Sequence, residues 1–375
     1  MASQSKIIPS SDFRAELKNR GGDSAFRCYQ CATCSSVCEL APEGAPFPRQ
    51  QMLYAQWGLA DRIAADPAVW LCHQCNDCTA RCPREANPGD VMQVVRSLAV
   101  ENLATPKFLG KLVGKARTTW PLLIGLPFVF WIVFIHAVNG FAIPPIEEIN
   151  GSMTFGWHNF VPHWMIYVTY IPTTLWVVIA IAISGGRYWK MMGEGVNRSG
   201  SFISNLIPVI IEILTHKRFG KCEAAKPRKT GHLVFMWGFI GAAFTTGVIV
   251  IAMYGFNYPL PVEQTHWMKV VGNISAILLV LGGLWLIFNR MGGGDSSGST
   301  TAFDTFFLFV AFMVGLTGAA TELARLYMSP ETACWIYVSH LSFILCLFGT
   351  FPYSKFAHMV YRTLAMVHER MAGSK

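Results

Sequence analysis

The apolar residues of this chain are concentrated after its first quarter. Up to about residue 105, short apolar and polar stretches alternate, whereas the remainder consists of long apolar blocks separated by polar loops. A helix that crosses a bilayer needs about 20 predominantly apolar residues. Six blocks have that length: 120–138, 163–184, 232–254, 266–288, 304–326 and 332–351. The pattern predicts six membrane-spanning helices behind a polar N-terminal domain.

The polar N-terminal part is predicted to be helical rather than built on strands. Between residues 49 and 65, apolar side chains such as Met52, Ala55 and Ile63 recur at helical spacing. A further helix is predicted at 88–103. The fold class we expect is therefore all-α.

The membrane part includes one long polar segment. Residues 1–118 are expected to form the N-terminal domain and its linker, and residues 119–375 the bundle, with a cytoplasmic loop at 185–231. Within that loop the apolar stretch 202–214 is too short to span a bilayer, so we expect it to lie along the inner membrane surface.

Composition supports a membrane protein and charge gives its orientation. The chain is 52% hydrophobic and 14% charged, whereas soluble domains carry about 25% charged residues. Lysine and arginine precede the first block and fill loop 185–231 and the tail; the loops 139–162, 255–265 and 327–331 contain none. Since basic loops stay in the cytoplasm, both termini and the N-terminal domain are predicted there. The net charge of +8 thus reflects membrane orientation, and no nucleic-acid partner is expected.

Two cysteine runs carry the clearest chemistry. Each has the pattern C-x2-C-x2-C-x3-C, in which three thiolates hold one [4Fe–4S] cube and the fourth reaches the other cube. The ligands expected for the first cluster are Cys28, Cys31, Cys34 and Cys82, and those for the second are Cys72, Cys75, Cys78 and Cys38. A disulfide framework suits small secreted chains, and zinc sites usually pair two C-x2-C knuckles. The runs therefore predict a helical two-cluster ferredoxin domain. The other cysteines, Cys222, Cys334 and Cys346, are expected to be packing residues.

Histidines in the apolar blocks form a second set of candidate ligands. Ionisable residues at membrane depth are usually functional, and imidazole pairs hold b-type haems. His340 and His358 are 18 residues apart, which on a continuous helix is five turns and about 27 Å, although Pro352 between them can kink it. His232 opens the third block on the inner side of the membrane, so its expected depth matches that of His358, and the two are predicted to hold one haem.

The partner of His340 is less clearly defined by the sequence. His163 is favoured, with His266 and His136 as alternatives, and the bundle is expected to hold two b haems, or one if the outer site is lost. His158, His216 and His368 are interpreted as ordinary helix-end residues. Four polar residues are candidates to contact a quinone or a haem propionate, or else are snorkelling anchors: Lys269, Asn273, Glu322 and Arg325.

The two halves resemble known redox families. Residues 1–105 resemble the C subunit of heterodisulfide reductase. Residues 155–370 are similar to cytochrome b subunits of the nitrate reductase gamma and heterodisulfide reductase type, on the motifs GHLVFMWGF from Gly231, DTFFL from Asp304, GLTG from Gly315, HL at His340 and PYSKFAH ending at His358. Their fusion resembles the C subunits of quinone-interacting membrane-bound oxidoreductases. One departure is Ala242, where the gamma family usually has the second haem-ligating histidine.

The resemblance implies a membrane-bound electron-transfer subunit of a bacterial or archaeal oxidoreductase complex. Electrons would pass between a quinone, expected to be menaquinone, the b haems and the two clusters. The implied partners are two flavin- and iron–sulfur-containing cytoplasmic subunits and, in dissimilatory sulfur metabolism, adenylylsulfate reductase. No separate active site for a soluble substrate is expected. The alternatives are the membrane subunit of a heterodisulfide or dithiol reductase and, less favoured, a transporter or anchor with a sensing domain based on the iron–sulfur clusters.

Overall fold

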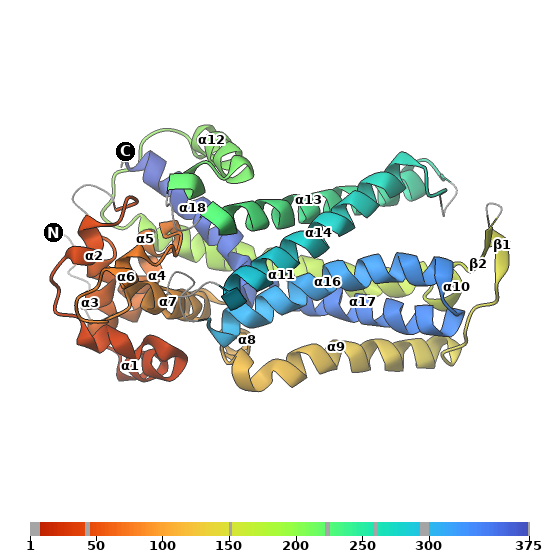
Figure 1. The fold of residues 1–375 in the computed structure, drawn as a ribbon, viewed down its shortest axis with the longest axis horizontal. Helices are drawn as coiled ribbons and strands as arrows, with labels where there is room; N and C mark the ends of the chain where they lie inside the picture. The colour runs from red at the N-terminus through yellow and green to blue at the C-terminus, as the bar shows by residue number, and fades with distance from the viewer. Residues whose placement is uncertain are drawn as a thin grey trace.

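The computed structural model describes residues 8–41, 46–149, 152–221, 226–258, 262–292 and 300–373. Figure 1 shows a helical N-terminal domain at one end of a bundle of long helices, with both chain ends on that side. The N-terminal domain contains α1 (Ser11–Leu17), η1 (Lys18–Gly22), η2 (Asp23–Arg27), α2 (Thr33–Ser36), α3 (Arg49–Trp57), α4 (Ala60–Ala65), α5 (Ala68–Leu71), α6 (Asp77–Ala80) and α7 (Pro88–Leu103).

The membrane part follows through a short connecting helix, α8 (Lys107–Gly114). Its long helices are α9 (Ala116–Asn139), α11 (His163–Met192), α13 (Lys226–Gly255), α14 (Trp267–Gly292), α16 (Ala302–Tyr327) and α17 (Pro330–Thr350). The remaining elements are β1 (Glu147–Ile149), β2 (Ser152–Thr154), α10 (Trp157–Phe160), α12 (Phe202–Thr215), η3 (Arg218–Lys221), η5 (Phe351–Tyr353), η6 (Lys355–Ala357) and α18 (His358–Met371).

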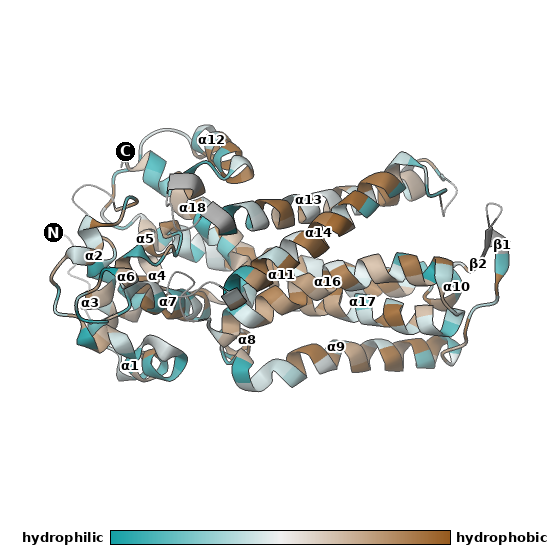
Figure 2. Ribbon diagram, in the orientation of Figure 1, coloured by the Kyte–Doolittle hydropathy of each residue, from teal (hydrophilic) through white to brown (hydrophobic). Residues whose placement is uncertain are grey.

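The six long helices coincide with the six apolar blocks of the sequence. Within the described residues, each is long and apolar enough to cross a membrane. Their outward faces stay apolar, as Leu126 and Ile171 illustrate, each with 63% of its surface exposed, and Figure 2 shows hydrophobic residues along the bundle. The all-α fold is thus confirmed, with one short antiparallel hairpin of β1 and β2 at the far end of the bundle.

Helices α13 and α14 pack most closely where glycine replaces a side chain. A Cβ on Gly238 would lie 2.8 Å from the backbone nitrogen of Leu279, and one on Gly282 would lie 2.6 Å from that of Phe235. Small residues that let backbones approach are typical of helix pairs in membranes. The pair α13/α14 is therefore held in a fixed register beside α16.

The N-terminal domain and the bundle share one hydrophobic core. Trp70 of α5 lies 4.9 Å from Tyr361 of α18 and 6.5 Å from Tyr188 of α11, measured between ring centroids. A buried ion pair joins Lys355 of η6 to Asp304 of α16 at 2.6 Å, and Gln93 of α7 donates to the same carboxylate. This interface positions the cysteine runs against one end of the bundle, the end at which α18 begins.

Two helix boundaries differ from those that the sequence predicts. The predicted helix 49–65 is broken at Gly58, which has φ 71° and whose Cβ would meet the carbonyl oxygen of Ser10 at 2.5 Å. The continuous helix expected from His340 to His358 is wrong: α17 ends at Thr350, two 3-10 turns follow around Pro352, and α18 begins at His358. The helix predicted at 88–103 is confirmed as α7.

Candidate cofactor sites

The two cysteine runs have the same backbone geometry. Gln30 and Gln74, two residues after the first cysteine of each run, have φ of 60° and 54°, and their N–H groups donate to Cys28 Sγ at 3.4 Å and Cys72 Sγ at 3.3 Å. The short helices α2 and α6 then start at matching places. This left-handed backbone curls each run around its own sulfur atoms.

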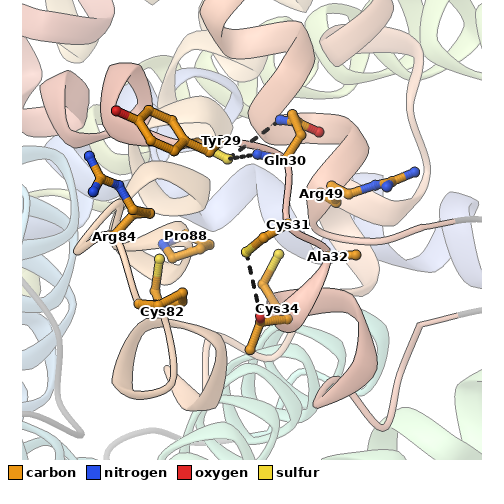
Figure 3. Close-up of a pocket in the computed structure, with 12 residues that line it drawn as sticks. Tyr29, Gln30, Cys31, Ala32, Cys34, Arg49, Cys82, Arg84 and Pro88 are labelled. Carbon is orange, nitrogen blue, oxygen red and sulfur yellow. Dashed lines mark hydrogen bonds between the residues drawn. The ribbon is translucent and has the colours of Figure 1, made fainter.

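Four cysteines from both runs line one pocket. These are Cys28, Cys31 and Cys34 of the first run and Cys82, the last cysteine of the second. In Figure 3 the sulfur atoms of Cys31, Cys34 and Cys82 face a common space. Cys31 is exposed and Cys34 is buried, so one edge of this pocket is open to solvent.

The other four cysteines are also neighbours. Cys38 interacts electrostatically with Cys72 and Cys75, as does Cys78. Burial raises the pKa of Cys38 to about 11. No three described His, Cys, Asp or Glu side chains are placed to share a single metal ion. The grouping matches the crosswise assignment, which stays a prediction as a ligand set.

Three histidines meet where α12, α13 and α18 approach one another. The ring centroids of His232 and His358 are 6.4 Å apart, with the rings at 79°. His216, at the C-terminal end of α12, places its Nε2 atom 2.8 Å from Nδ1 of His232. His216 Nδ1 in turn lies 2.7 Å from the carbonyl oxygen of Ile213, and His358 Nδ1 lies 2.5 Å from that of Lys355.

These hydrogen bonds fix the tautomer of each ring. A carbonyl oxygen only accepts, so Nδ1 carries the proton in His216 and in His358. Burial lowers the pKa of His216 and that of His358, the latter to about 4, so both rings are neutral. Nε2 of His216 is then an acceptor, and His232 donates from Nδ1. Both His232 and His358 therefore keep an unprotonated Nε2, the form of imidazole that binds metals.

A basic shell lies between these histidines and the second cysteine run. Arg362 donates to the His73 ring at 3.0 Å, and Arg96 and Arg228 donate to backbone carbonyls of the same run. Burial, and next the charge of Arg362, lower the pKa of His73 well below its usual value. Burial also lowers the pKa of Arg362 to about 10. His73 is thus a neutral acceptor for a buried guanidinium.

A cavity of about 40 Å³ lies beside this shell. Its lining includes Arg96, Arg362, Asp304, Lys355 and His358. Burial lowers the pKa of Lys355 to about 8, although Asp304 acts in the opposite direction. The cavity connects the second cysteine run with His358.

The structure does not bring His340 together with its predicted partners. His340 Nδ1 lies 3.1 Å from Thr317 Oγ1, and a Cβ on Gly318 would be 3.0 Å from the ring. His340 is about 15 Å along α17 from Pro330, whereas His163 is the first residue of α11.

The three predicted partners belong to the end of the bundle that is remote from the N-terminal domain. His163 has its ring contacts with His158 and Tyr167, His266 lies against Tyr258, and His136 is exposed. Within the described residues, no ring contact joins any of them to His340. The fourth haem ligand therefore stays a prediction.

Three of the four quinone candidates form a cluster where α14 begins and α16 ends. Glu322 accepts from Lys269 at 2.8 Å and from Gln264 at 2.6 Å, and it lies 3.8 Å from Arg325. Asn273, one turn further along α14, is exposed. The same ion pairs and hydrogen bonds would be present if Lys269, Glu322 and Arg325 had a purely structural role. Their contact with a quinone therefore stays a prediction.

Sequence reasoning missed His216 and the arginine shell. The contact of His216 with His232 arises because α12 folds back so that its last turn meets the start of α13. A histidine with φ 51° at a helix end is unusual for a non-glycine residue, and the sequence pattern carries no signal of it. Cys334 and Cys346 are buried as expected, and Cys222 lies outside the described residues.

Comparison with known proteins supports the N-terminal site. Residues 24–86 match the family model described as a 4Fe-4S dicluster domain. The chain is 40% identical over 93 residues to the C subunit of the H(2):CoB-CoM heterodisulfide,ferredoxin reductase of Methanothermobacter thermautotrophicus. It is 37% identical over 89 residues to a protein of Archaeoglobus profundus that is named for its likeness to the C subunit of heterodisulfide reductase. Each match covers 24% of this chain and spans about half the length of the relative, 49% and 47%.

A further relative covers both halves. The citrate utilization protein B of Escherichia coli is 24% identical over 361 residues, which is 91% of this chain and 88% of that protein. No solved structure matches. The fold and the cysteine runs therefore define an iron–sulfur electron-transfer protein with a multi-pass membrane part. Its N-terminal region is a two-cluster domain like that of heterodisulfide reductase C subunits, and the Escherichia coli relative is consistent with a fused second domain.

Proposed function

We propose that this chain carries electrons between a membrane quinone and a cytoplasmic redox partner, through b-type haem and two [4Fe–4S] clusters. The observation that carries the proposal is the pair His232 and His358, two neutral imidazoles with free Nε2 atoms and ring centroids 6.4 Å apart. The pair lies beside the second cysteine run, which His73 and Arg362 connect to α18.

The separation of the two rings is compatible with a metal ion held by both. Metal–imidazole bonds are about 2 Å long, so two imidazoles that shared one ion would have their centroids roughly 6 Å apart. Both tautomers are held by hydrogen bonds that Nδ1–H donates, to the Lys355 carbonyl oxygen from His358 and to His216 Nε2 from His232, the usual arrangement for metal-bound histidine. The residues present therefore fit a haem, which when bound would supply a one-electron centre.

The chain's own residues supply the surroundings of this centre. His216 and the Lys355 carbonyl orient the two rings, and the Asp304–Lys355 pair keeps that part of η6 against α16. A second haem at His340, with a ligand from His163, His266 or His136, belongs to the same proposal. The proposal also includes a quinone site near Lys269, Asn273, Glu322 and Arg325. It further includes the cytoplasmic orientation of the clusters.

Haem content tests the proposal directly. The purified chain is expected to show the reduced-minus-oxidised spectrum of b-type haem, and His232→Ala and His358→Ala are each expected to lose the inner haem, because one axial ligand is removed. His158→Ala, at the outer end of the bundle, is the matched control and should keep it. A wild-type protein with full iron–sulfur content and no haem would refute the proposal.

The partner is a separate part of the proposal. The names of the N-terminal relatives favour, as the second candidate, the membrane subunit of a heterodisulfide or dithiol reductase. The first candidate instead joins two flavin- and iron–sulfur-containing subunits and adenylylsulfate reductase. Proteins that co-purify with the tagged chain from native membranes distinguish the two: a thiol-reducing subunit supports the second candidate, and a flavoprotein pair with adenylylsulfate reductase supports the first.

A further inference from the structure

Three arginines from separate helices converge on the second cysteine run. Arg96 of α7 donates to the carbonyl oxygens of Val69, at 2.8 Å, and of Cys72. Arg362 of α18 contacts the Cys72 carbonyl at 3.5 Å and the His73 ring at 3.0 Å. Arg228 of α13 donates to the carbonyl oxygen of His73.

None of these acceptors is a carboxylate: the triad's partners on this run are backbone carbonyl oxygens and the His73 ring. Within the described residues, none of the ion pairs involves these three arginines, whereas Arg20 and Arg218 each pair with two carboxylates. Cations removed from water are strongly unfavourable unless an anion lies nearby. We will call Arg96, Arg228 and Arg362 the arginine triad.

The cavity next to the triad has an excess of positive charge. Arg96, Arg362 and Lys355 line it together with one carboxylate, that of Asp304. That carboxylate is already occupied by Lys355 at 2.6 Å, by Thr301 at 3.0 Å and by Gln93. His358 lines the same cavity, so these cationic side chains lie between a proposed haem ligand and the second cysteine run.

We propose that the arginine triad is an anion site shared by the second [4Fe–4S] cluster and the carboxylate groups of a haem between His232 and His358. This rests on the proposed function. A cube with four thiolate ligands is an anion, and haem carries two carboxylates, so both groups would place negative charge beside the triad. Among the described carboxylates, Glu212 acts on Arg362, but it is already paired with Arg218. Exchange of one electron between them forms and breaks no bond, and a fixed positive charge favours the reduced state of each centre because reduction adds negative charge.

The test replaces the charge of one arginine at a time in the intact membrane-bound protein. In Arg362→Gln, one of the two cluster midpoint potentials is expected to fall by an amount equivalent to a tenfold weaker reduction, about 59 mV for one electron. The other cluster should be unchanged. Arg362→Lys keeps the charge and should keep most of the potential, while losing the planar hydrogen-bonding fork. The readouts are electron paramagnetic resonance and optical redox titrations, with haem content measured alongside.

Arg187→Gln is the matched control. Arg187 also donates to a carbonyl at the domain interface, that of Leu103 at 3.3 Å, but it is exposed. Its replacement should shift neither cluster. If Arg362→Gln does not assemble, Arg228→Gln gives the same readout from another helix.

Two results would overturn the inference. One is unchanged cluster and haem potentials in the Gln variants at full cofactor content. The other is equal shifts in Arg362→Gln and Arg362→Lys, which would mean that hydrogen bonding and not charge is responsible. A wild-type protein without haem would instead refute the proposed function and the shared haem carboxylates, while the cluster potential would still report on the triad.

Discussion

His216 shows how a single side chain outside the ligand pair can control it. Its Nε2 accepts from His232 Nδ1 at 2.8 Å, and its own Nδ1 donates to Ile213 at 2.7 Å. Partners of this kind orient a metal-bound imidazole and raise its basicity. The last turn of α12 is thereby linked to the proposed inner haem.

Replacement of His216 should weaken haem binding without removing a ligand. Since such outer partners typically contribute about 10–100-fold in metal affinity, His216→Ala should lose haem on dilution or detergent washing far more readily than the wild type. His216→Gln, whose side-chain oxygen can accept from His232, should recover part of this loss. Haem-to-protein ratios after graded washing measure the effect, with His158→Ala as the control. Retention equal to wild type in His216→Ala would contradict the positioning role.

At the scale of the elements, the Asp304–Lys355 pair joins four segments. Asp304 lies in the first turn of α16, Lys355 lies in η6, and Gln93 comes from α7. The Lys355 carbonyl oxygen accepts from His358 at the start of α18. The pair is buried on the Asp304 side, which is 3% exposed. It therefore holds the break after α17 in the conformation that presents His358.

Asp304→Asn should destabilise the protein, because it leaves the Lys355 ammonium without its counter-charge. Breaking a buried pair from one side costs about 3–5 kcal/mol, so a clear fall in the thermal unfolding midpoint is expected in detergent. The double variant Asp304→Asn/Lys355→Met should recover much of it. Glu85→Gln breaks an exposed pair with Arg27 at 3.8 Å, and it should have almost no effect. A double variant as unstable as the single one would contradict this explanation.

The break after α17 also explains which parts of the site a sequence can specify. The spacing inside each cysteine run is local, so the grouping of Cys28, Cys31 and Cys34 could be predicted, and the crosswise place of Cys82 followed from the chemistry of the cube. The relative orientation of His340 and His358 could not be predicted from the sequence. The helix ends just before Pro352, so helical periodicity no longer relates the two side chains.

Contacts between segments that are far apart in the sequence were the hardest to predict. Arg362 reaches His73 across 289 positions, and nothing in the local pattern of either segment signals that approach. Matching histidines by their expected depth in the membrane did pair His232 with His358, because both were expected at the cytoplasmic end of the bundle. It failed to distinguish His163 from His266 and His136, because all three lie near the outer ends of their blocks.

At the scale of the whole molecule, charge is strongly asymmetric. Loop 185–231, which contains α12, lies at the same end of the bundle as the cysteine runs (Figure 1), and the loops at the other end contain no lysine or arginine at 139–162 and 327–331. Basic segments are retained in the cytoplasm. The clusters are thus expected to face the cytoplasm.

Fusion reporters at the C-terminus test this orientation. A fluorescent protein that folds only in the cytoplasm should be bright, and alkaline phosphatase at the same position should be inactive, since it requires export. A phosphatase fused after residue 258, in the loop between α13 and α14, should be active and serves as the opposite control. Active phosphatase at the C-terminus would mean that the bundle is inserted the other way round.

The shared core has a consequence for the order in which this protein matures. The second cysteine run is made before the six long helices, but Trp70 packs on Tyr361 and Cys72 is contacted by Arg362, both from α18, which follows those helices. N-terminal domains commonly fold first during synthesis. Here that half reaches its final environment only after all six long helices and α18 have been made, so the biosynthetic machinery that delivers iron and sulfur is expected to act on a chain whose membrane part is already present.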